Sequence, residues 1–321
     1  MTDIVDELQW RGQLAHTTDL DELRAVLADG PVTFYFGFDP TAPSLHVGNL
    51  VQVTAMRRLQ LAGHKPLALV GGATGLIGDP SGRSTERQLN STEIVAEWVN
   101  RIQDQVSRFL SFEGENAARM VNNLDWADPM SAINFLRDVG THFPVNKMLA
   151  REVVASRLET GLSFTEFSYQ LLQGMDFLEL HRRFGCVLQG GGSDQWGNLT
   201  AGTDLIRRVT GNHVHAISTP LLTKPDGTKY GKTAGGAIWL DPELTSPDAF
   251  FQYWINVGDN EVSKLLRTFS FKPREEIEDL EKRSAARPEA RIGQLALAEE
   301  LTTLVHGAQK MEKAIAASQR C

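Results

Sequence analysis

Short apolar runs alternate with longer helical patterns over the first two thirds of the chain. The runs VTFYFGF, PLALVGG and CVLQGG occupy residues 32–38, 66–72 and 186–191. Nearly continuous apolar runs of this length are typical of buried strands in a parallel sheet, whose two faces are covered by helices. The pattern therefore predicts an α/β fold built on a parallel sheet.

One intervening segment has a clear helical period. Asn90 and Glu93 have the spacing of a capping box, which predicts a helix over 91–110. Because the apolar residues of this segment repeat at helical spacing, they should share one face and cover the sheet. The predicted face consists of Val95, Trp98, Ile102, Val106 and Phe109.

The strand pattern stops at about residue 245, and helical spacing continues to the end. Pro273 before Glu275 is typical of a helix start and Gly307 of a helix end. Three units are therefore predicted: a catalytic domain over 1–220, a linker over 221–246 and a small all-helical domain over 247–321. The apolar residues that predict the last unit are Leu265, Leu266, Ile277, Leu280, Leu295, Leu301 and Leu304.

Composition narrows the kinds of site and partner. No apolar run approaches the length of a membrane span, and the acidic start MTDIVDEL does not resemble a signal peptide, so a cytoplasmic location without membrane contact is expected. Two cysteines and eight scattered histidines predict no structural metal. A net charge of -8 predicts that any RNA is met by local patches, since the whole surface is not basic.

The segment 34–50, FYFGFDPTAPSLHVGNL, combines an apolar strand, a turn and a helix start. A helix start presents unpaired N–H groups and a positive dipole end, and Gly48 lets a ligand approach the backbone. With His46 as a further donor, the segment suits a phosphate ligand. An ordinary helix cap is the alternative reading of the four letters HVGN.

A second segment, DGTKYGKT at 226–233, places Lys229 and Lys232 in a turn-rich stretch. Two lysines there could neutralise a departing pyrophosphate, although a solvated hairpin tip has the same composition. An early H-x-G-[HN] paired with a late K-x-x-K-[ST] resembles the two signatures of class I aminoacyl-tRNA synthetases. The pair is much more specific than either half.

Three further blocks resemble the tyrosyl-tRNA synthetase family, bacterial type. They are GGATGLIGDPSG at 71–82, FTEFSYQLLQGMDF at 164–177 and GGSDQWGN at 191–198. The likeness runs from about residue 6 to about residue 310 and implies a Rossmann-like doubly wound parallel sheet followed by a small helical domain. It also implies a homodimer that forms tyrosyl-adenylate from tyrosine and ATP and transfers tyrosine to tRNA(Tyr).

The likeness implies a tyrosine site. Three of its residues lie at i, i+4 and i+7 and could line one wall of a pocket from one helix face, although a polar solvated face has the same spacing. A phenol met by a hydroxyl and a carboxylate would be distinguished from phenylalanine, because the analogue leaves buried polar groups unpaired. The implied tyrosine-binding residues are Tyr35, Asp79, Asn123, Tyr169, Gln173, Asp176 and Gln195.

The likeness also implies an ATP site, with Mg²⁺ accompanying the nucleotide. No general base is required, because the attacking carboxylate is already ionised and catalysis rests on alignment and charge stabilisation. The implied ATP-binding residues are Gly37, Asp39, His46, Gly48, Asn49, Gly192, Asp194 and Lys232. The implied catalytic residues are Thr41, His46, Asn49, Arg83, Arg87, Lys229, Lys232 and Thr233.

The chain departs from the family pattern at four positions that bear on the site. Asn49 replaces a second histidine, Phe36 a cysteine and Gly190 a bulky aliphatic residue, while Tyr230 is a milder change. Asparagine can still form a hydrogen bond, so adenylation should survive. Phe36 is expected to alter the wall beside the ribose, and Gly190 to loosen the packing.

The family pattern normally continues into a further RNA-binding domain that holds the anticodon region, and no counterpart of it is expected in the printed sequence. A shortened synthetase of this kind is expected to activate tyrosine but to charge tRNA poorly. Four alternatives stay open from sequence alone. They are a paralogue that passes tyrosine to another acceptor, a catalytically silent RNA-binding homologue, a tryptophan-specific sister enzyme and a nucleotidyltransferase with the same helix-start motif.

Overall fold

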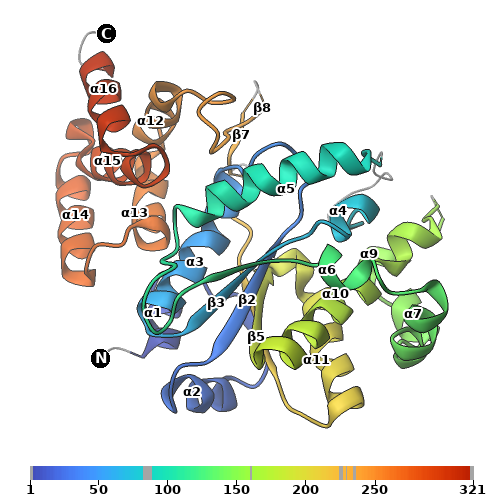
Figure 1. Cartoon of the computed structure of the whole chain (residues 1–321). Coiled ribbons are helices and arrows are strands. Elements are labelled where there is room, and N and C mark those ends of the chain that lie inside the picture. Colours follow the sequence, from blue (N-terminus) through green and yellow to red (C-terminus); the bar gives the residue numbers. More distant parts are fainter. Residues whose placement is uncertain are drawn as a thin grey trace.

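A twisted sheet forms the centre of the molecule (Figure 1). The computed structural model describes residues 3–81, 89–159, 161–223, 227–228, 230–233 and 236–318. Within these residues the main sheet has six strands in the order β1-β6-β5-β2-β3-β4, and β7 and β8 form a separate hairpin. The strands are β1 His16–Thr17, β2 Thr33–Phe38, β3 Lys65–Val70, β4 Arg119–Asn122, β5 Cys186–Gly192, β6 His215–Thr219, β7 Lys232–Thr233 and β8 Gly236–Ala237.

The strand order identifies where a ligand should bind. All neighbours from β4 to β6 are parallel, and only the short edge strand β1 is antiparallel. The chain runs outward from β2 through β3 and β4, then returns to the other side of β2 with β5 and β6. In doubly wound sheets such a reversal opens a crevice at the carboxyl ends of the two central strands. The predicted α/β fold with a parallel sheet is confirmed.

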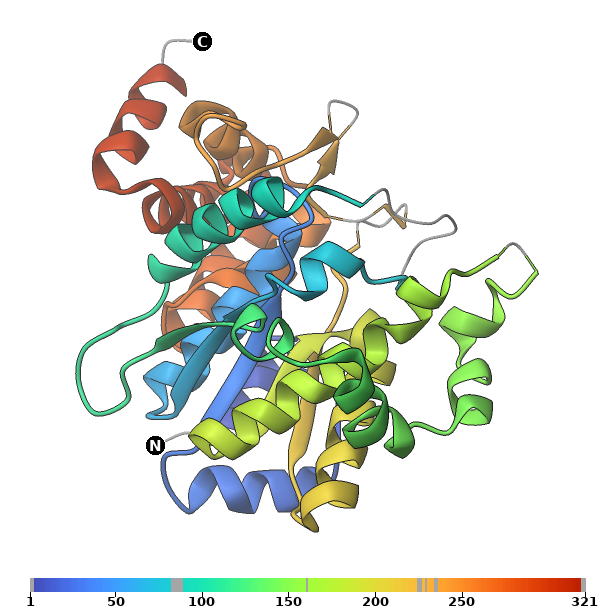
Figure 2. The ribbon, with the colours of Figure 1, turned by 45° about the vertical axis from the view of Figure 1, so that its right-hand side comes forward.

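Helices cover both faces of the sheet and make up the C-terminal part (Figures 1 and 2). Among the described residues, none of them is long and apolar enough to cross a lipid bilayer. The helices are α1 Ile4–Trp10, α2 Leu20–Ala28, α3 Leu50–Leu61, α4 Thr74–Ile77, α5 Thr92–Ser107, α6 Leu124–Ala127, α7 Ala132–Asp138, α8 Val145–Leu149, α9 Glu152–Ala155, α10 Phe164–Phe184, α11 Trp196–Thr210, α12 Pro247–Ile255, α13 Asp259–Phe269, α14 Arg274–Ala286, α15 Ile292–His306 and α16 Ala308–Ser318.

Strand β2 separates two apolar cores because its side chains alternate between the faces of the sheet. Phe34, Phe36 and Phe38 belong to the core that also contains residues of α3, α5 and the C-terminal helices. Tyr35 belongs to the other core, formed mainly by α10 and α11. Tyr35 therefore points to the face on which α10 presents its polar residues, a consequence of its place in the strand.

Helix α5 corrects one detail of the predicted caps. Its N-cap is Ser91, whose hydroxyl accepts a hydrogen bond from the Ile94 amide, so the predicted capping box of Asn90 and Glu93 is wrong. Serine in this position satisfies one of the N–H groups that a helix start leaves unpaired. The predicted apolar face is largely right, with Trp98 only partly buried and Val99 joining the buried side.

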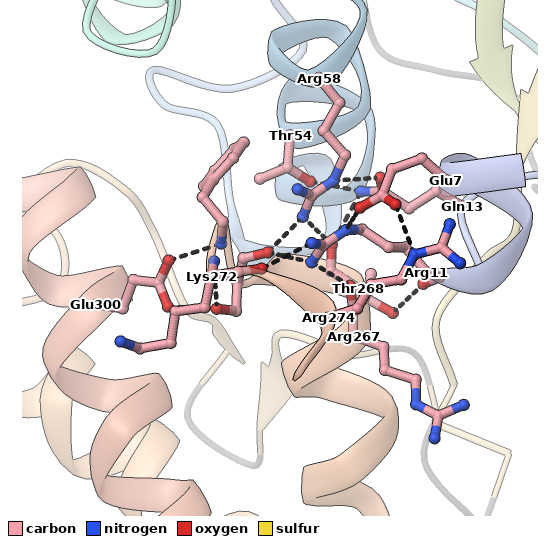
Figure 3. Close-up of polar contacts among 12 residues, drawn as sticks. Glu7, Arg11, Gln13, Thr54, Arg58, Arg267, Thr268, Lys272, Arg274 and Glu300 are labelled. Carbon is pink, nitrogen blue, oxygen red and sulfur yellow. Dashed lines mark hydrogen bonds and ion pairs between the residues drawn. The ribbon is translucent and has the colours of Figure 1, made fainter. Parts of the chain in front are cut away.

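The C-terminal helices are fastened to the sheet by buried arginines (Figure 3). Arg58, near the end of α3, donates to the backbone carbonyls of Thr268 and Ser270 at 3.1 and 2.8 Å. Arg11, after α1, donates to the Lys272 carbonyl at 2.8 Å and also to Ser270. These carbonyls lie at the C-terminal end of α13, where a helix leaves acceptors unpaired and its dipole is negative.

Arg58 is almost fully buried, and its polar surroundings are matched to its charge. Its Nε donates to the Gln13 side chain at 2.8 Å, and the ring of Phe271 lies 4.4 Å from the guanidinium carbon. Burial and the neighbouring Arg11 lower the pKa of Arg58, but guanidinium stays protonated in proteins. The junction is therefore a charged, hydrogen-bonded contact between α3 and α13.

Candidate active site

A cavity of about 180 Å³ opens at the carboxyl ends of β2 and β5. The two strands are neighbours at the reversal of the sheet, so their ends form the crevice expected for the ligand. One wall is the backbone of β5, and the opposite wall is the polar face of α10. The lining residues are Tyr35, Gly37, Asp39, Gln52, Leu69, Thr74, Asp79, Tyr169, Gln173, Asp176, Gln189, Gly190, Gly191, Gly192, Asp194 and Gln195.

The buried end of the cavity holds Asp176 and Tyr35. Asp176 accepts hydrogen bonds from Asn123 Nδ2 at 3.0 Å and from Trp126 Nε1 at 2.8 Å. Burial raises the pKa of Asp176 to about 7, and the two donors oppose this rise because they favour the charged form. The Tyr35 hydroxyl is buried with no hydrogen-bond partner among the described residues. A hydroxylated ring could therefore pair with both groups.

A second polar group lies along the α10 wall. The Tyr169 hydroxyl donates to Asp39 Oδ2 at 2.6 Å, and Thr74 donates to Asp39 Oδ1 at 2.6 Å. Asn123 then donates to the Thr74 hydroxyl at 2.9 Å, which links this group to Asp176. The network fixes the side chains before any ligand binds, so the cavity is preformed.

Asp79 and Gln195 approach the cavity from two loops. The Gln195 amide donates to Asp79 Oδ2, and the Ser81 amide donates to Asp79 Oδ1 at 2.9 Å. Gln173 lines the same cavity from α10, on the helix face that also carries Tyr169 and Asp176. Carboxylate and amide oxygens gathered here suit a ligand ammonium group.

The mouth of the cavity contains a side chain that no motif had identified. Gln52, in the first turn of α3, lines the cavity together with Asp194. A Cβ added at Gly192 would lie 3.0 Å from Gln52 Nε2 and 2.6 Å from Asp194 Oδ1. Both polar side chains therefore lie over the end of β5 and fill the space that a side chain at Gly192 would occupy.

The predicted anion-binding turn has the expected shape. His46 Nδ1 accepts a hydrogen bond from the Gly48 amide at 3.0 Å, and Asn49 Oδ1 accepts one from the His46 amide at 3.0 Å. Since Nδ1 is the acceptor, the ring proton is on Nε2, which can donate to a ligand. Gly48 is required, because an added Cβ would lie 2.7 Å from the His46 ring. Asn49 thus both caps the turn and replaces the expected histidine.

The two signature segments meet in space although they are nearly two hundred residues apart. The Val47 amide donates to the Ile238 carbonyl and the Leu240 amide to the Leu45 carbonyl, both at 2.9 Å. These bonds place residues 238–240, which follow β8, beside the anion-binding turn, and the Ile238 amide in turn donates to the carbonyl of Gly231 in the second signature segment at 2.6 Å. The convergence that the paired motifs predict is therefore present in the backbone.

Of the remaining predicted site residues, three lie within the described residues and three lie outside them. Thr41 is exposed near the start of the turn, where its amide donates to the Asp39 carbonyl at 2.9 Å. Lys232 and Thr233 form β7, which pairs with β8. The predicted residues Arg83, Arg87 and Lys229 lie outside the described residues.

A family model for class I tRNA synthetases specific for tryptophan and tyrosine matches residues 27–321. The chain belongs to this family. Two curated relatives, from Streptomyces avermitilis and Acidothermus cellulolyticus, are each named "Tyrosine--tRNA ligase". They are 66% and 62% identical to this chain, which is called the synthetase below. Both alignments cover 99% of this chain and 76% of the relative. These identities place the chain among the tyrosine-specific members.

Solved structures agree with this placement. A C-terminally truncated mitochondrial tyrosyl-tRNA synthetase from Aspergillus nidulans superimposes on the synthetase with a TM-score of 0.91 at 28% identity. The match covers 100% of this chain and 94% of the Aspergillus chain. The sheet followed by a helical region is therefore shared by both structures.

Two departures from the family pattern compensate each other in the synthetase. Phe36 and Gly190 are directly opposite in the register of β2 and β5. A Cβ added at Gly190 would lie 2.1 Å from Phe36 Cζ, so the ring fills the space that a side chain at Gly190 would occupy. Looser packing at Gly190 was therefore a wrong expectation. The Phe36 ring is fully buried in the core beneath the sheet and does not block the cavity.

Sequence reasoning missed several lining or supporting residues of the synthetase. Gln52 lies four residues after Gly48, and this helical spacing could have indicated that it faces the same ligand. Thr74 lies in the block at 71–82 and Gln189 in the apolar run at 186–191, but neither was assigned to the site, and only the fold shows that they line the cavity. Trp126 comes from α6, a four-residue helix too short to show periodicity. The site thus includes residues that the sequence motifs did not assign to it.

Proposed function

We propose that this synthetase activates L-tyrosine with ATP, forming tyrosyl-adenylate and pyrophosphate, and transfers the tyrosine to tRNA(Tyr). The observation that carries the proposal is the buried pair of Tyr35 and Asp176 at the closed end of the cavity. Their hydroxyl and carboxylate match a phenol. We also propose that the reaction takes place in the cytoplasm, where ATP and tRNA are supplied.

Tyrosine fits the cavity with its ring toward the sheet and its charged end toward the loops. The phenol hydroxyl donates to Asp176 and pairs with the Tyr35 hydroxyl, which has no other partner among the described residues. The ammonium group lies among Asp79, Tyr169 and Gln173, where the fixed Asp79 carboxylate supplies the opposite charge. Phenylalanine would leave the buried groups unpaired at roughly 1 to 3 kcal/mol each.

ATP then extends from the mouth of the cavity to the anion-binding turn. The ribose lies over Gly192 with Asp194, and the phosphates lie against His46 and the start of α3, whose positive dipole end attracts negative charge. The tyrosine carboxylate attacks the α-phosphorus, forming one P–O bond while the bond to pyrophosphate breaks. His46 and Lys232 stabilise the charge that develops on the phosphate oxygens.

Mg²⁺ enters this proposal only as a companion of ATP. Among the described residues, no three His, Cys, Asp or Glu side chains are grouped so that they could hold a metal ion. The protein thus offers no metal cage of its own there, and the nucleotide phosphates would supply the oxygen ligands that Mg²⁺ prefers.

Pyrophosphate exchange into ATP, measured with each of the twenty amino acids, tests the proposal. We expect exchange with tyrosine and none with phenylalanine. Exchange with tryptophan alone would indicate the sister specificity, and binding of RNA without any exchange would indicate a silent homologue. A parallel assay with tRNA(Tyr) separates a synthetase from a paralogue that activates tyrosine for another acceptor.

Replacing Trp126 by Phe should shift the pH dependence of tyrosine binding. Trp126 Nε1 donates to Asp176, and such a bond favours the ionised carboxylate, so its loss raises the pKa of Asp176 further. The ionised form accepts the phenol hydrogen bond. Calorimetric titrations from pH 6 to pH 8.5 should therefore show an affinity loss of about tenfold near pH 7, diminishing toward pH 8.5.

The pH dependence of the affinity loss distinguishes a hydrogen-bonding role of Trp126 from a structural one. A merely structural tryptophan would lower the affinity equally at every pH. A pH-independent loss in the Trp126→Phe protein would therefore contradict the role that we assign to the indole nitrogen.

We further propose that the synthetase is a homodimer. Helix α7 has no buried residue, and it lies with α8 and α9 on the side of the molecule away from the C-terminal helices (Figures 1 and 2). Ile133 and Phe164 are 72% and 73% exposed there. An apolar surface of this kind is typical of an interface, and it lies in the segment that the family likeness implies as the subunit contact.

Replacing Phe164 by Asp should convert the dimer to a monomer. A charge at the centre of an apolar contact would have to be buried unpaired, so the dissociation constant should rise at least about 100-fold. Light scattering after size-exclusion chromatography measures the mass. The matched control is Leu61→Asp, since Leu61 is 60% exposed at the end of α3. A monomeric unmodified protein, or a dimeric Phe164→Asp protein, would contradict the proposal.

A further inference from the structure

Two residues directly before Lys232 are held by the C-terminal helices. The Tyr230 hydroxyl donates to Glu261 Oε1 of α13 at 2.7 Å, and the Gly231 amide donates to the Tyr253 hydroxyl of α12 at 3.1 Å. Tyr230 is only 4% exposed, and its hydrogen bond to Glu261 is partly buried. These bonds fix a segment that the sequence motif alone would place in a solvated turn.

The same two residues pack on the anion-binding turn. A Cβ at Gly231 would lie 3.1 Å from Val47 Cβ and 3.3 Å from the Gly48 amide nitrogen. Gly231 also has a φ of 79°, a conformation that favours glycine. Tyr230–Gly231 therefore forms the contact between the two signature segments, and its position determines where β7 begins.

Glu261 is itself held in place. Its Oε2 accepts a hydrogen bond from the Gly258 amide at 3.3 Å, at the N-cap of α13. The far end of α13 is the end fastened by Arg11 and Arg58 (Figure 3). The Glu261 carboxylate that accepts the Tyr230 hydrogen bond is thus carried by α13, a helix that Arg58 anchors to α3.

Packing alone does not fix the Tyr230 ring. A cavity of about 380 Å³ is lined by Tyr230, Tyr253 and Glu261 together with neighbouring residues of α12. A ring beside a cavity has space to move unless a directional contact holds it. The hydrogen bond to Glu261 supplies that contact, and Tyr230 is one of the positions where this chain departs from its family pattern.

We infer that Glu261 and Tyr253 are positioning residues, which hold Tyr230–Gly231 so that Lys232 begins beside the phosphate-binding turn. The inference rests on the proposed adenylation, because it assigns the lysine segment to the triphosphate. It adds a contribution of the helical region to catalysis: α12 and α13 set the geometry of the active site through two hydrogen bonds.

The Tyr230→Phe variant removes one hydroxyl and little else. We expect the exchange rate at saturating substrates to fall about tenfold, the scale of one hydrogen bond to a charged group, while KM for tyrosine stays within about twofold. Glu261→Gln keeps an oxygen acceptor and should lose less than Glu261→Leu. The double variant Tyr230→Phe/Glu261→Leu should be no slower than Glu261→Leu alone. An unchanged rate, or losses that multiply in the double variant, would overturn the inference.

Two further measurements keep the outcomes distinct. Glu281→Gln removes an ion pair between Arg267 of α13 and Glu281 of α14, and it should leave exchange unchanged. Hydrogen–deuterium exchange at the Gly231 amide reads the contact without any catalysis and should accelerate in Tyr230→Phe and Tyr253→Phe. Absence of tyrosine-dependent exchange in the unmodified protein would refute the proposed function. Unchanged Gly231 protection in both variants would refute the positioning role.

Discussion

The Asp176→Ala protein is expected to lose about 10²- to 10³-fold in kcat/KM for tyrosine. The substitution removes the acceptor of the phenol hydrogen and leaves the Asn123 and Trp126 donors unpaired in a buried site. Losing the phenol acceptor and leaving these buried donors unpaired costs about 3 to 4 kcal/mol in sum, which corresponds to about 10²- to 10³-fold. Pyrophosphate exchange with tyrosine varied at saturating ATP measures the effect directly.

The kinetic constants that change identify the cause of the lost activity. Because Asp176 contacts only the ring end of the substrate, KM for ATP should change little, and the preference for tyrosine over phenylalanine should shrink. Asp279→Ala is the matched control, since Asp279 is exposed on α14 and forms an ion pair with Arg283. Tyrosine use that is unchanged in Asp176→Ala would contradict the assigned pocket and favour another acceptor chemistry.

Replacing His46 should slow adenylate formation without weakening tyrosine binding. A donor that acts on the developing phosphate charge contributes about 2 to 4 kcal/mol, so His46→Ala should lower kcat roughly 30- to 900-fold. KM for tyrosine should stay within about twofold, because the cavity residues that hold tyrosine do not include His46. Single-turnover adenylate formation separates this step from product release.

A second variant distinguishes chemistry from helix capping. His46 also accepts a hydrogen bond from the Gly48 amide, and asparagine is among the best residues at this cap position. His46→Asn should therefore keep the thermal stability of the unmodified protein and still lose kcat as His46→Ala does. Full activity in His46→Asn would show that His46 acts only as a helix cap and not in the chemical step.

The strongest strand patterns were sufficient to predict the centre of the sheet. Strands β2, β3 and β5 lie within a residue or two of the predicted apolar runs, because each is buried on both faces. Strand β4 was missed, since Arg119 and Asn122 at its ends interrupt a short apolar stretch. Strand β1 has two residues and no pattern at all. The limits of the three predicted domains stay a prediction.

The site was predicted where residues follow one another along an element, and missed where contact crosses elements. Tyr169, Gln173 and Asp176 share a helix face, so their spacing was informative. Trp126 reaches Asp176 from a separate short helix. The contact of Phe36 with Gly190 depends on an irregularity in the pairing of β2 with β5, which shifts the register by one residue. No local pattern encodes such a shift.

The buried arginine junction has a consequence for how the protein loses its structure. Arg11 and Arg58 are nearly inaccessible to solvent, and their acceptors lie between Thr268 and Lys272. If the C-terminal helices melted first, two guanidinium groups would lose these carbonyls, and the apolar core that α3 and α5 share with the C-terminal helices would be divided. Such a half-melted species is costly. Sheet and helices therefore form one cooperative unit on heating, although the chain carries them as successive segments.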